Sequence, residues 1–303
     1  MSIRLEEVSL IYHPGTPFQT AALECITCTM TKGDITGITG PTGSGKSTLL
    51  QLLNGLLKPS SGQVFIDGER IDQLGGEKLT QLRRKVALAF QFPEKQVFEL
   101  TVREDIAFGP RQLGLRGEEL ENRVCWAMEQ VGLPPARYAE RTCASLSGGQ
   151  KRLVALAGIV AMRPDYVLLD EPWAGLDAVA RQHLKQFILR LKGEGTTVVL
   201  VSHDLEDLVE ISDRLLLLKE GRLIMQGPTR TVLNHCSELV ASGIEVPVWH
   251  RVLLEIKKRC PEINLAVTDV EEAADELERL LRSAHLRCRS RKQEHSGPRE
   301  NGA

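Results

Sequence analysis

The most constraining feature of the sequence is a glycine-rich loop at residues 40–47, placed between two stretches of expected regular structure. Its eight residues read Gly-Pro-Thr-Gly-Ser-Gly-Lys-Ser and fit the pattern G-x-x-x-x-G-K-[ST]. The apolar run at 35–39 predicts a buried strand before the loop, and residues 48–53 are typical of a helix opening. Glycines allow the tight turn, and unpaired N–H groups at a helix N-terminus attract anions. A chance Gly/Ser-rich connector would not match every fixed position, so the loop predicts binding of a nucleoside triphosphate.

The loop side chains can be matched to parts of the nucleotide. Lys46 is expected to reach the β- and γ-phosphates, and Ser47 to place its hydroxyl on Mg²⁺. The residues that we expect to contact the nucleotide are Gly40, Pro41, Thr42, Gly43, Ser44, Gly45, Lys46, Ser47 and Thr48.

Two further strand ends carry polar residues. The apolar run at 166–169 is followed directly by Asp170 and Glu171, and the run at 197–201 leads to His203. Ligands bind at the carboxyl ends of strands in open α/β sheets. Asp170 suits coordination of Mg²⁺, Glu171 suits polarisation of an attacking water, and His203 could donate to a γ-phosphate. A lone strand-end histidine is usually structural, so the last assignment depends on its neighbours.

A second helix start has the character of an anion site. Ser147 is a favourable N-cap, and Gln150 completes a capping box with it. Gly148 and Gly149 would expose backbone N–H groups in the first turn. An ordinary capped helix would explain Ser147 and Gln150 but not the paired glycines.

Composition excludes some classes of function. The net charge of −2 and the aromatic content of 4% give no basis for binding nucleic acid. The apolar run at 153–162 is too short to span a bilayer, and the charged residues at 4–7 do not resemble a signal peptide. We therefore expect a soluble chain whose role at a membrane, if it has one, is peripheral.

The seven cysteines are scattered along the chain, which is typical of reduced thiols. Cys25 and Cys28 have the C-x-x-C spacing of redox or zinc sites, but the sequence has no second such pair. We interpret Cys28 as a small core residue that alternates inward with Ile26 and Met30.

The order of patterns predicts an α/β fold with a mostly parallel sheet and an inserted helical subdomain. Near-continuous apolar runs suit parallel strands that are buried on both faces. Expected strands occupy 3–12 (as an edge or outer strand), 22–30, 35–39, 62–68, 85–90, 166–169 and 197–201, and expected helices lie within 103–145 and at 181–191.

The composition changes after Gly227 and Pro228. Residues 245–260 and 269–283 are expected to be helical, and Thr268 with Glu271 fits a capping box. An apolar stripe along the second helix is either the core of a small domain or a surface for a partner; it consists of Val270, Ala273, Ala274, Leu277, Leu280 and Leu281. The arginine-rich stretch from His285 onward is expected to be a disordered, solvated tail, with binding to anionic lipid as the lesser alternative.

Taken together in order and spacing, these segments resemble the ABC-transporter ATPases over residues 3–230. The resemblance rests on the loop, Gln91, 146–150, 166–171, Ala174-Gly175-Leu176-Asp177 and His203. It implies a P-loop ABC-type domain, with an antiparallel β part beside the parallel sheet, that binds ATP and Mg²⁺ and hydrolyses ATP. It also implies an obligate dimer of cassettes, in which Ser147, Gly148, Gly149 and Gln150 contact the ATP held by the other subunit.

The resemblance assigns three more residues. Gln91 is expected to join the γ-phosphate and Mg²⁺ to the helical subdomain, Asp177 to make a contact across the dimer, and Tyr12 to stack on adenine. Since the chain contains a single cassette, the second one must come from another chain.

A closer similarity is to the ATPases of energy-coupling factor (ECF) transporters, which import vitamins and transition-metal ions. It rests on residues 12–18, 53–59, 90–94, 105–110 and 157–162, and on the helical C-terminal extension. It implies peripheral attachment at the cytoplasmic face of the cell membrane, to a transmembrane scaffold subunit whose coupling helix would meet residues 91–98. A separate membrane subunit would choose the solute. The second ATPase would be a paralogue, although a homodimer stays open.

The resemblance also sets the expected domains. They are an ATPase domain at 1–235 with its helical subdomain at about 95–162, an extension at 236–284 that helps to pair two ATPases, and the tail at 285–303. The sequence departs from the family at Trp173, where Thr is usual, and at Ala178, where Pro is usual. Trp173 adjoins Glu171 and therefore bears on the rate of hydrolysis.

Three alternatives stay open. An ATPase of an ordinary ABC importer would fit the core but would explain the loop at 14–17 and the C-terminal extension less well. A non-transport ABC protein usually has two cassettes in one chain or a long coiled-coil insert. A regulatory module that binds ATP without turnover would not need Glu171 and His203.

Overall fold

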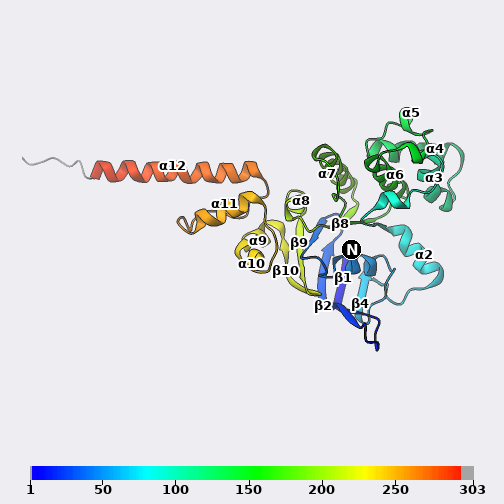
Figure 1. Ribbon diagram of the computed structural model, residues 1–303, viewed down its shortest axis with the longest axis horizontal. Helices are drawn as coiled ribbons and strands as arrows, with labels where there is room; N and C mark the ends of the chain where they lie inside the picture. Colours follow the sequence, from blue (N-terminus) through cyan, green and yellow to red (C-terminus); the bar gives the residue numbers. More distant parts are fainter. Residues whose placement is uncertain (1, 295–303) are drawn as a thin grey trace, which may run out of the picture. The chain divides into compact units, whose positions relative to one another are not determined.

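The structure is a computed structural model that describes the backbone of residues 2–294 and the side chains of residues 2–282 (Figure 1). The chain divides into two compact units, Met1–Pro228 and Thr229–Ala303. This division falls before the boundary expected after residue 235, because the chain passes directly from a strand that ends at Pro228 into a helix that begins at Thr229.

The first unit contains a six-stranded sheet with the order β10-β9-β3-β8-β7-β6. Strands β6, β7, β8, β3 and β9 run parallel, and β10 pairs antiparallel with β9 at the edge. Every residue of β3, β7 and β8 is buried, as the continuous apolar runs predict for strands covered on both faces. The bounds are Ile35–Thr39 (β3), Val86–Ala89 (β6), Tyr166–Asp170 (β7), Thr197–Val201 (β8), Arg214–Lys219 (β9) and Arg222–Pro228 (β10).

A second, antiparallel sheet of four strands has the order β2-β1-β4-β5. Its strands are Ser2–Tyr12 (β1), Thr20–Thr31 (β2), Ser61–Ile66 (β4) and Glu69–Arg70 (β5). The expectation that the first strand lies at an edge is wrong, because β1 pairs with β2 on one side and with β4 on the other. Both edges of β1 form backbone hydrogen bonds, one with β2 and the other with β4. The alternation of apolar and polar side chains within one strand does not reveal how many neighbours that strand has.

Cys28 is a core residue, as expected. It is buried on the same face of β2 as Ile26 and Met30. Burial raises the pKa of its thiol to about 12, so the thiolate needed for redox or metal chemistry is strongly disfavoured.

Helix α1 (Lys46–Leu53) lies in the core between the two sheets. Its leucines Leu49, Leu50, Leu52 and Leu53 are at most 1% exposed, and they share one apolar cluster with residues of both sheets. Since the N-terminus of α1 immediately follows the glycine-rich loop, this packing holds the loop at the carboxyl end of β3.

Between β6 and β7 the chain is helical, and Figure 1 shows α3, α4, α5 and α6 gathered together beside the sheet. Helix α6 packs against α3, α4 and the short helix η1. The helices of the first unit are α1, α2 (Gly76–Lys85), η1 (Pro93–Gln96), α3 (Val102–Gln112), α4 (Gly117–Gln130), α5 (Pro135–Tyr138), η2 (Cys143–Ser145), α6 (Gly148–Ala161), α7 (Ala178–Gly193) and α8 (Leu205–Val209).

The second unit consists of helices joined by loops over its described residues, the longest loop running between α11 and α12. It contains α9 (Thr229–Leu233), α10 (Cys236–Ala241), α11 (Val248–Lys257) and α12 (Val270–Glu294). Arg230 donates to both carboxylate oxygens of Glu272 and to the carbonyl of Ala266, at 2.5, 2.9 and 2.7 Å. These bonds tie α9 to the start of α12.

Two expectations for α12 are wrong. The helix does not end at Ser283 but continues to Glu294. Residues 284–294 are mostly good helix formers, and no glycine or proline occurs between Ser283 and Gly297. The rest of the expected tail, 295–303, lies outside the described residues. The capping pair is also displaced by one residue: Asp269 accepts from the N–H of Glu272, and Glu272 reaches back to Thr268.

The apolar stripe of α12 is only partly core. Ala273 is buried, whereas Val270 is 58% exposed and Leu281 is 67% exposed. The buried position that completes the inner face of the helix is Glu276, which accepts from the N–H of Asn264 and pairs with Arg279.

The core position of α1 leads to a stability prediction. Leu50→Ala removes a fully buried side chain and leaves a cavity between the sheets, so we expect the free energy of unfolding to fall by about 2–5 kcal/mol. Leu100→Ala is the matched control, because Leu100 is 70% exposed, and its effect should stay within about 0.5 kcal/mol. Denaturant unfolding of the full chain followed by circular dichroism measures both, and equal losses would contradict this packing of α1.

Candidate functional site

The glycines of the loop are required by its backbone. Gly40, Gly43 and Gly45 have φ values of 150°, 80° and 99°, in the region that side chains disfavour. A Cβ on Gly40 would lie 1.9 Å from the carbonyl oxygen of Leu218, and one on Gly45 would lie 2.5 Å from that of Ala22. The loop is therefore wrapped closely against β9 and β2, and only glycine fits at these two points.

Lys46 is held inside the loop. Its Nζ donates to the carbonyls of Gly40 and Pro41 at 2.7 and 3.0 Å, and the residue is 8% exposed. Burial lowers the pKa of Lys46 from its usual value, while the charges of Glu171 and Asp170 act to raise it. The ammonium group is thus already placed at the loop, between carbonyl dipoles and two nearby carboxylates.

Asp170 is the last residue of β7 and is 7% exposed. Burial raises the pKa of its carboxyl group, a hydrogen bond with Ser47 lowers it, and the charge of Glu171 raises it again. Among the described residues its Oδ1 has no hydrogen-bond partner. A buried carboxylate oxygen without a partner, beside the Ser47 hydroxyl, fits a site that is completed by a hard cation.

Glu171 lies at the turn after β7. Its φ of 48° is unusual for a residue with a side chain, and its N–H donates to the carbonyl of Val201 at 3.0 Å. Its Oε1 accepts from the N–H of His203 at 2.9 Å, and its Oε2 lies 2.8 Å from Nδ1 of the same residue. The predicted base and the predicted phosphate donor are therefore in direct contact.

Tyr12 is also near the loop. Its hydroxyl lies 3.1 Å from Oγ1 of Thr48, in the first turn of α1. The end of β1 thus brings Tyr12 next to the first turn of α1. Contact of its ring with the base stays a prediction.

The segment at 147–150 forms the predicted capping box. Ser147 accepts from the N–H of Gln150 at 3.3 Å, and the Gln150 side chain accepts from the N–H of Ser147 at 3.1 Å. Gly148 and Gly149 are exposed in the first turn of α6. The N-terminus of this helix is consequently open to a ligand from outside the chain.

Asp177 is the N-cap of α7 and accepts from the N–H of Ala180 at 2.8 Å. It shares a pocket of 230 Å³ with Ser147, Gly149 and Gln150. Among the residues that the structure describes, no hydrogen bond or ion pair connects these residues to the phosphate loop. The predicted nucleotide contacts therefore form two separate groups within one chain.

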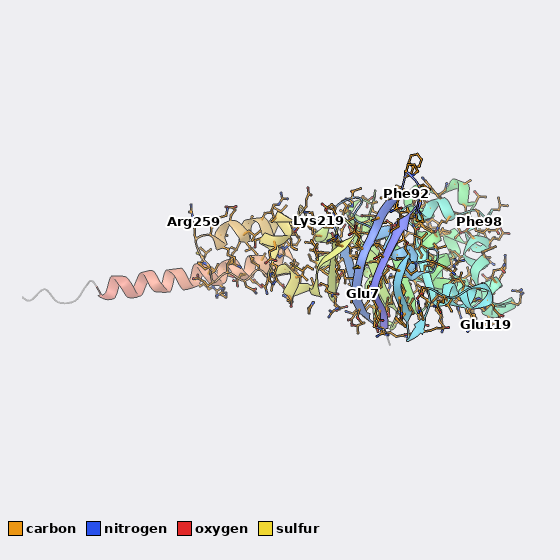
Figure 2. The ribbon with its side chains drawn as sticks, turned by 90° about the horizontal axis from the view of Figure 1, so that it is seen from below. Glu7, Phe92, Phe98, Glu119, Lys219 and Arg259 are labelled. Atoms are coloured by element: carbon orange, nitrogen blue, oxygen red, sulfur yellow. The ribbon has the colours of Figure 1, made fainter. Side chains whose placement is uncertain are left out.

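Gln91 is exposed and lies two residues after the end of β6, in the segment that leads into η1. Beside it lie exposed aromatic residues, of which Phe92 and Phe98 are labelled in Figure 2. Phe90 and Phe108 line a mostly apolar pocket of 370 Å³ with residues of α3 and α6. Of residues 91–98, which were expected to meet a coupling helix, Gln96 lines this pocket. The position of the coupling helix itself stays a prediction.

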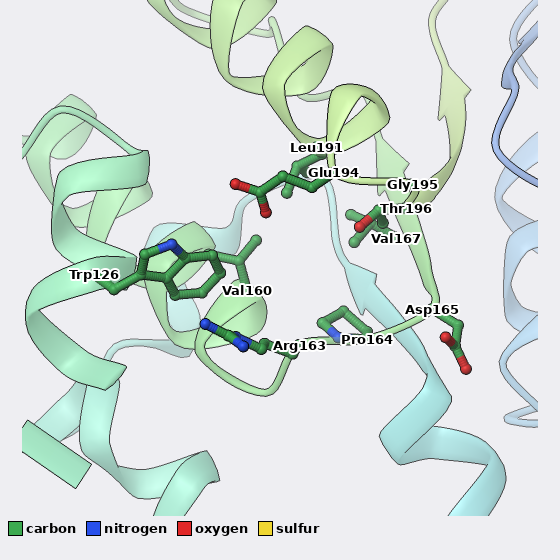
Figure 3. A pocket seen from close by; sticks show the side chains of 10 residues that line it. All are labelled: Trp126, Val160, Arg163, Pro164, Asp165, Val167, Leu191, Glu194, Gly195 and Thr196. Carbon is green, nitrogen blue, oxygen red and sulfur yellow. The ribbon is translucent and has the colours of Figure 1, made fainter. Parts of the chain in front are cut away.

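A different pocket, of 430 Å³, lies at the amino ends of β7 and β8 (Figure 3). The side chains of Trp126, Arg163 and Glu194 point into it, and the Arg163 guanidinium lies 4.8 Å from the centre of the Trp126 ring. It contains none of the predicted site residues; Lys46, Asp170 and Glu171 lie at the opposite, carboxyl ends of the strands.

The sequence motifs do not point to Arg152. This residue is 5% exposed and touches the segments that follow both Gln91 and Glu171. The feature that could have indicated its burial is its position directly before the apolar run at 153–162 of the same helix.

Within the described residues, no group of three or more His, Cys, Asp or Glu side chains could hold a metal ion. None of the helices within residues 2–294 combines the length and apolarity that a membrane crossing needs.

Comparisons with known proteins agree with this geometry. The model of the ABC transporter family matches residues 23–174. The energy-coupling factor transporter ATP-binding protein EcfA2 of Clostridium acetobutylicum is 42% identical over 285 residues, which cover 94% of this chain and 99% of that protein.

Solved structures are similar as well. CbiO1 from Clostridium perfringens, part of the ABC transporter complex cbiONQ, has a TM-score of 0.71 at 32% identity over 86% of this chain and 96% of its own. The ATP-binding cassette MJ0796, solved as a dimer bound to ADP and Pi, has a TM-score of 0.67 at 30% identity over 75% and 98% of the two chains. The chain belongs to the ABC transporter ATPases, among the ATP-binding proteins of energy-coupling factor transporters.

Proposed function

We propose that this chain binds and hydrolyses ATP to power an ECF-type importer. The observation that carries the proposal is the convergence of Lys46, Asp170, Glu171 and His203 at the carboxyl ends of neighbouring parallel strands. Relatives of this chain are named as energy-coupling factor transporter ATP-binding proteins.

The phosphate loop binds the triphosphate. Its N–H groups and the N-terminus of α1 face the anion, and Lys46 exchanges its two carbonyl partners for phosphate oxygens. The residues 40–48 supply these contacts, and the ring of Tyr12 stacks on adenine.

Ser47, Asp170 and Gln91 would hold Mg²⁺. The Ser47 hydroxyl and the unpartnered Oδ1 of Asp170 are oxygen ligands of the kind that Mg²⁺ takes, together with phosphate oxygens. When bound, the ion neutralises charge on the phosphates. Gln91 lies on an exposed segment and would join this group from the helical side.

Hydrolysis needs a polarised water next to the γ-phosphate. Glu171 is the proposed base, and His203 holds its carboxylate in place and donates to the phosphate. Gln91 completes the catalytic group.

The separation of the two groups of contacts supports a dimer of cassettes. Ser147, Gly148, Gly149 and Gln150, with Asp177, would complete the nucleotide site of a second ATPase subunit. We propose a paralogue as this partner, because the opening at 12–18 is similar to one of two ATPase types. The C-terminal extension at 236–284 would help to pair the two ATPases.

The exposed surface around Gln91 and Phe92 would receive a transmembrane scaffold subunit. The chain would then lie peripherally at the cytoplasmic face of the cell membrane. The solute, a vitamin or a transition-metal ion, would be chosen by another membrane subunit that this chain meets only indirectly.

The composition of the assembly tests the proposed function. A tagged full-length chain, extracted from membranes in mild detergent, should bring with it a second cassette protein and a polytopic membrane protein, both identified by mass spectrometry. Co-purification with the subunits of an ordinary ABC importer would contradict the ECF assignment. Recovery only in the soluble fraction, with ribosomal or DNA-bound partners, would contradict transport altogether.

Glu171→Gln should retain ATP binding, lower the hydrolysis rate by about 10²–10⁴-fold and trap a closed ATP-bound dimer, because the amide cannot accept a proton from water. Phosphate release and size-exclusion chromatography measure the two effects. Lys46→Ala is the contrasting variant and should abolish ATP binding itself. Turnover by Glu171→Gln at the rate of the unmodified chain would refute the assignment of the base.

Asp170→Asn tests the metal site without relying on activity. Because burial raises the pKa of Asp170, stability is greatest with the carboxyl protonated, below the usual pKa, and is lost as pH rises through the raised value. At neutral pH the neutral amide should therefore raise the unfolding temperature of the nucleotide-free chain, by about 2–4 °C.

The same variant should also lose the effect of Mg²⁺ on the unfolding temperature. This effect is the difference between the unfolding temperature with ATP and Mg²⁺ and the unfolding temperature with ATP and a chelator. Asp165→Asn is the control, since Asp165 carries an exposed carboxylate outside the site and should change neither quantity. A lower unfolding temperature, or an undiminished Mg²⁺ effect, in Asp170→Asn would count against this site.

A further inference from the structure

Arg152 is a buried cation whose contacts are not accounted for by nucleotide binding. It lies on α6, in the turn after Gln150, and its side chain is only 7% exposed. A buried guanidinium is stable only where its donors are satisfied, so its partners define a specific geometry. Those partners come from two other segments of the first unit.

The first segment is the turn that carries Glu171. Nη1 of Arg152 donates to the carbonyl of Pro172 at 3.2 Å and to that of Ala174 at 2.6 Å. The turn itself begins with the left-handed backbone of Glu171 and is closed by a bond from the N–H of Ala174 to the carbonyl of Glu171. Arg152 is therefore hydrogen-bonded to the backbone directly after the proposed base.

The second segment is η1, which begins shortly after Gln91. Oε2 of Glu94 accepts from both Nε and Nη2 of Arg152 at 3.3 Å. Glu94 is 22% exposed, so water screens this ion pair only in part. The segment between Gln91 and Glu94 also carries the exposed Phe92 of the apolar surface.

The planar guanidinium connects these two segments rigidly. One edge meets the carboxylate of Glu94, while Nη1 meets the two carbonyls of the turn, and a lysine ammonium has no such fork. Trp173, which stands between Pro172 and Ala174 in the sequence, is 3% exposed, so the turn is anchored in the interior of the first unit. Movement of η1 must consequently act on the turn that begins at Glu171.

We propose that Arg152 is a positioning residue for ATP hydrolysis, which links the segment after Gln91 to the backbone that orients Glu171. This inference rests on the proposed role of Glu171. It implies that a partner seated on the surface around Phe92 changes the hydrolysis rate through Glu94 and Arg152. It also implies that the link acts on turnover and leaves ATP binding to the phosphate loop.

Glu94→Gln is the decisive variant, because it removes the charge that ties Arg152 to η1 and leaves the bonds to the turn. In the complex retrieved with the tagged full-length chain, we expect kcat to fall about ten-fold while KM for ATP stays within about two-fold. The rate is expressed per chain that binds ATP, so that any loss of folded protein is removed from kcat.

Arg152→Lys tests the rigid link from the other side. It should lower kcat to a similar extent, and the double variant with Glu94→Gln should fall little further, because both changes break one connection. Arg103→Gln is the matched control: Arg103 pairs with Glu121 and Glu140 in the helical part, away from the turn, and its loss should leave kcat within about two-fold.

Unchanged kcat in Glu94→Gln, or fully additive effects in the double variant, would overturn the inference. Glu171→Gln in the same assay separates this result from failure of the proposed function. If Glu171→Gln stops turnover and Glu94→Gln does not, only the link through Arg152 is wrong. If Glu171→Gln turns over normally, the role of Glu171 is wrong, and the inference falls with it.

Discussion

The packing of α1 between the two sheets is the interaction on which the rest of the first unit depends. Its leucines are buried against strands of both sheets, so the helix can neither rotate nor slide without opening the core. This fixes the first turn of α1 at the carboxyl end of β3, where the glycine-rich loop arrives. The loop can then present its N–H groups to an anion without rearranging when the anion binds.

The charges at the site are arranged at a cost to the nucleotide-free chain. Burial disfavours both the ammonium of Lys46 and the carboxylate of Asp170. It therefore lowers the pKa of Lys46 and raises the pKa of Asp170, and each shift favours the neutral form. Phosphate oxygens and a cation would favour the charged forms again. Binding can therefore release an unfavourable state that folding has imposed on these side chains.

One chain contains only part of the proposed reaction centre. The loop, Asp170, Glu171 and His203 form one group, whereas the start of α6 and Asp177 form another. Arg152 lines the same pocket as the second group, and its hydrogen bonds go to the backbone behind Glu171 and to the carboxylate of Glu94. Such an arrangement lets a partner outside the site influence the chemistry through the backbone, without contacting the nucleotide.

The sequence by itself determined the parts that depend on local pattern. These include the strand before the loop, the capping box of Ser147 and Gln150, the inward-facing Cys28 and the polar residues at the strand ends. Each follows from periodicity or from bonds between residues close in the chain. The family also followed from the order and spacing of such segments.

Only the tertiary structure decided features that join distant segments. The interior position of β1, the contact of Glu171 with His203, the unpartnered oxygen of Asp170 and the contacts of Arg152 depend on pairings across tens of residues. The start and end of α12 also differed from expectation, although their causes are local: Asp269 accepts from the N–H of Glu272 at the cap, and no glycine or proline follows Ser283 before Gly297. Local pattern states which groups are polar or apolar, whereas burial and partners depend on which groups meet in space.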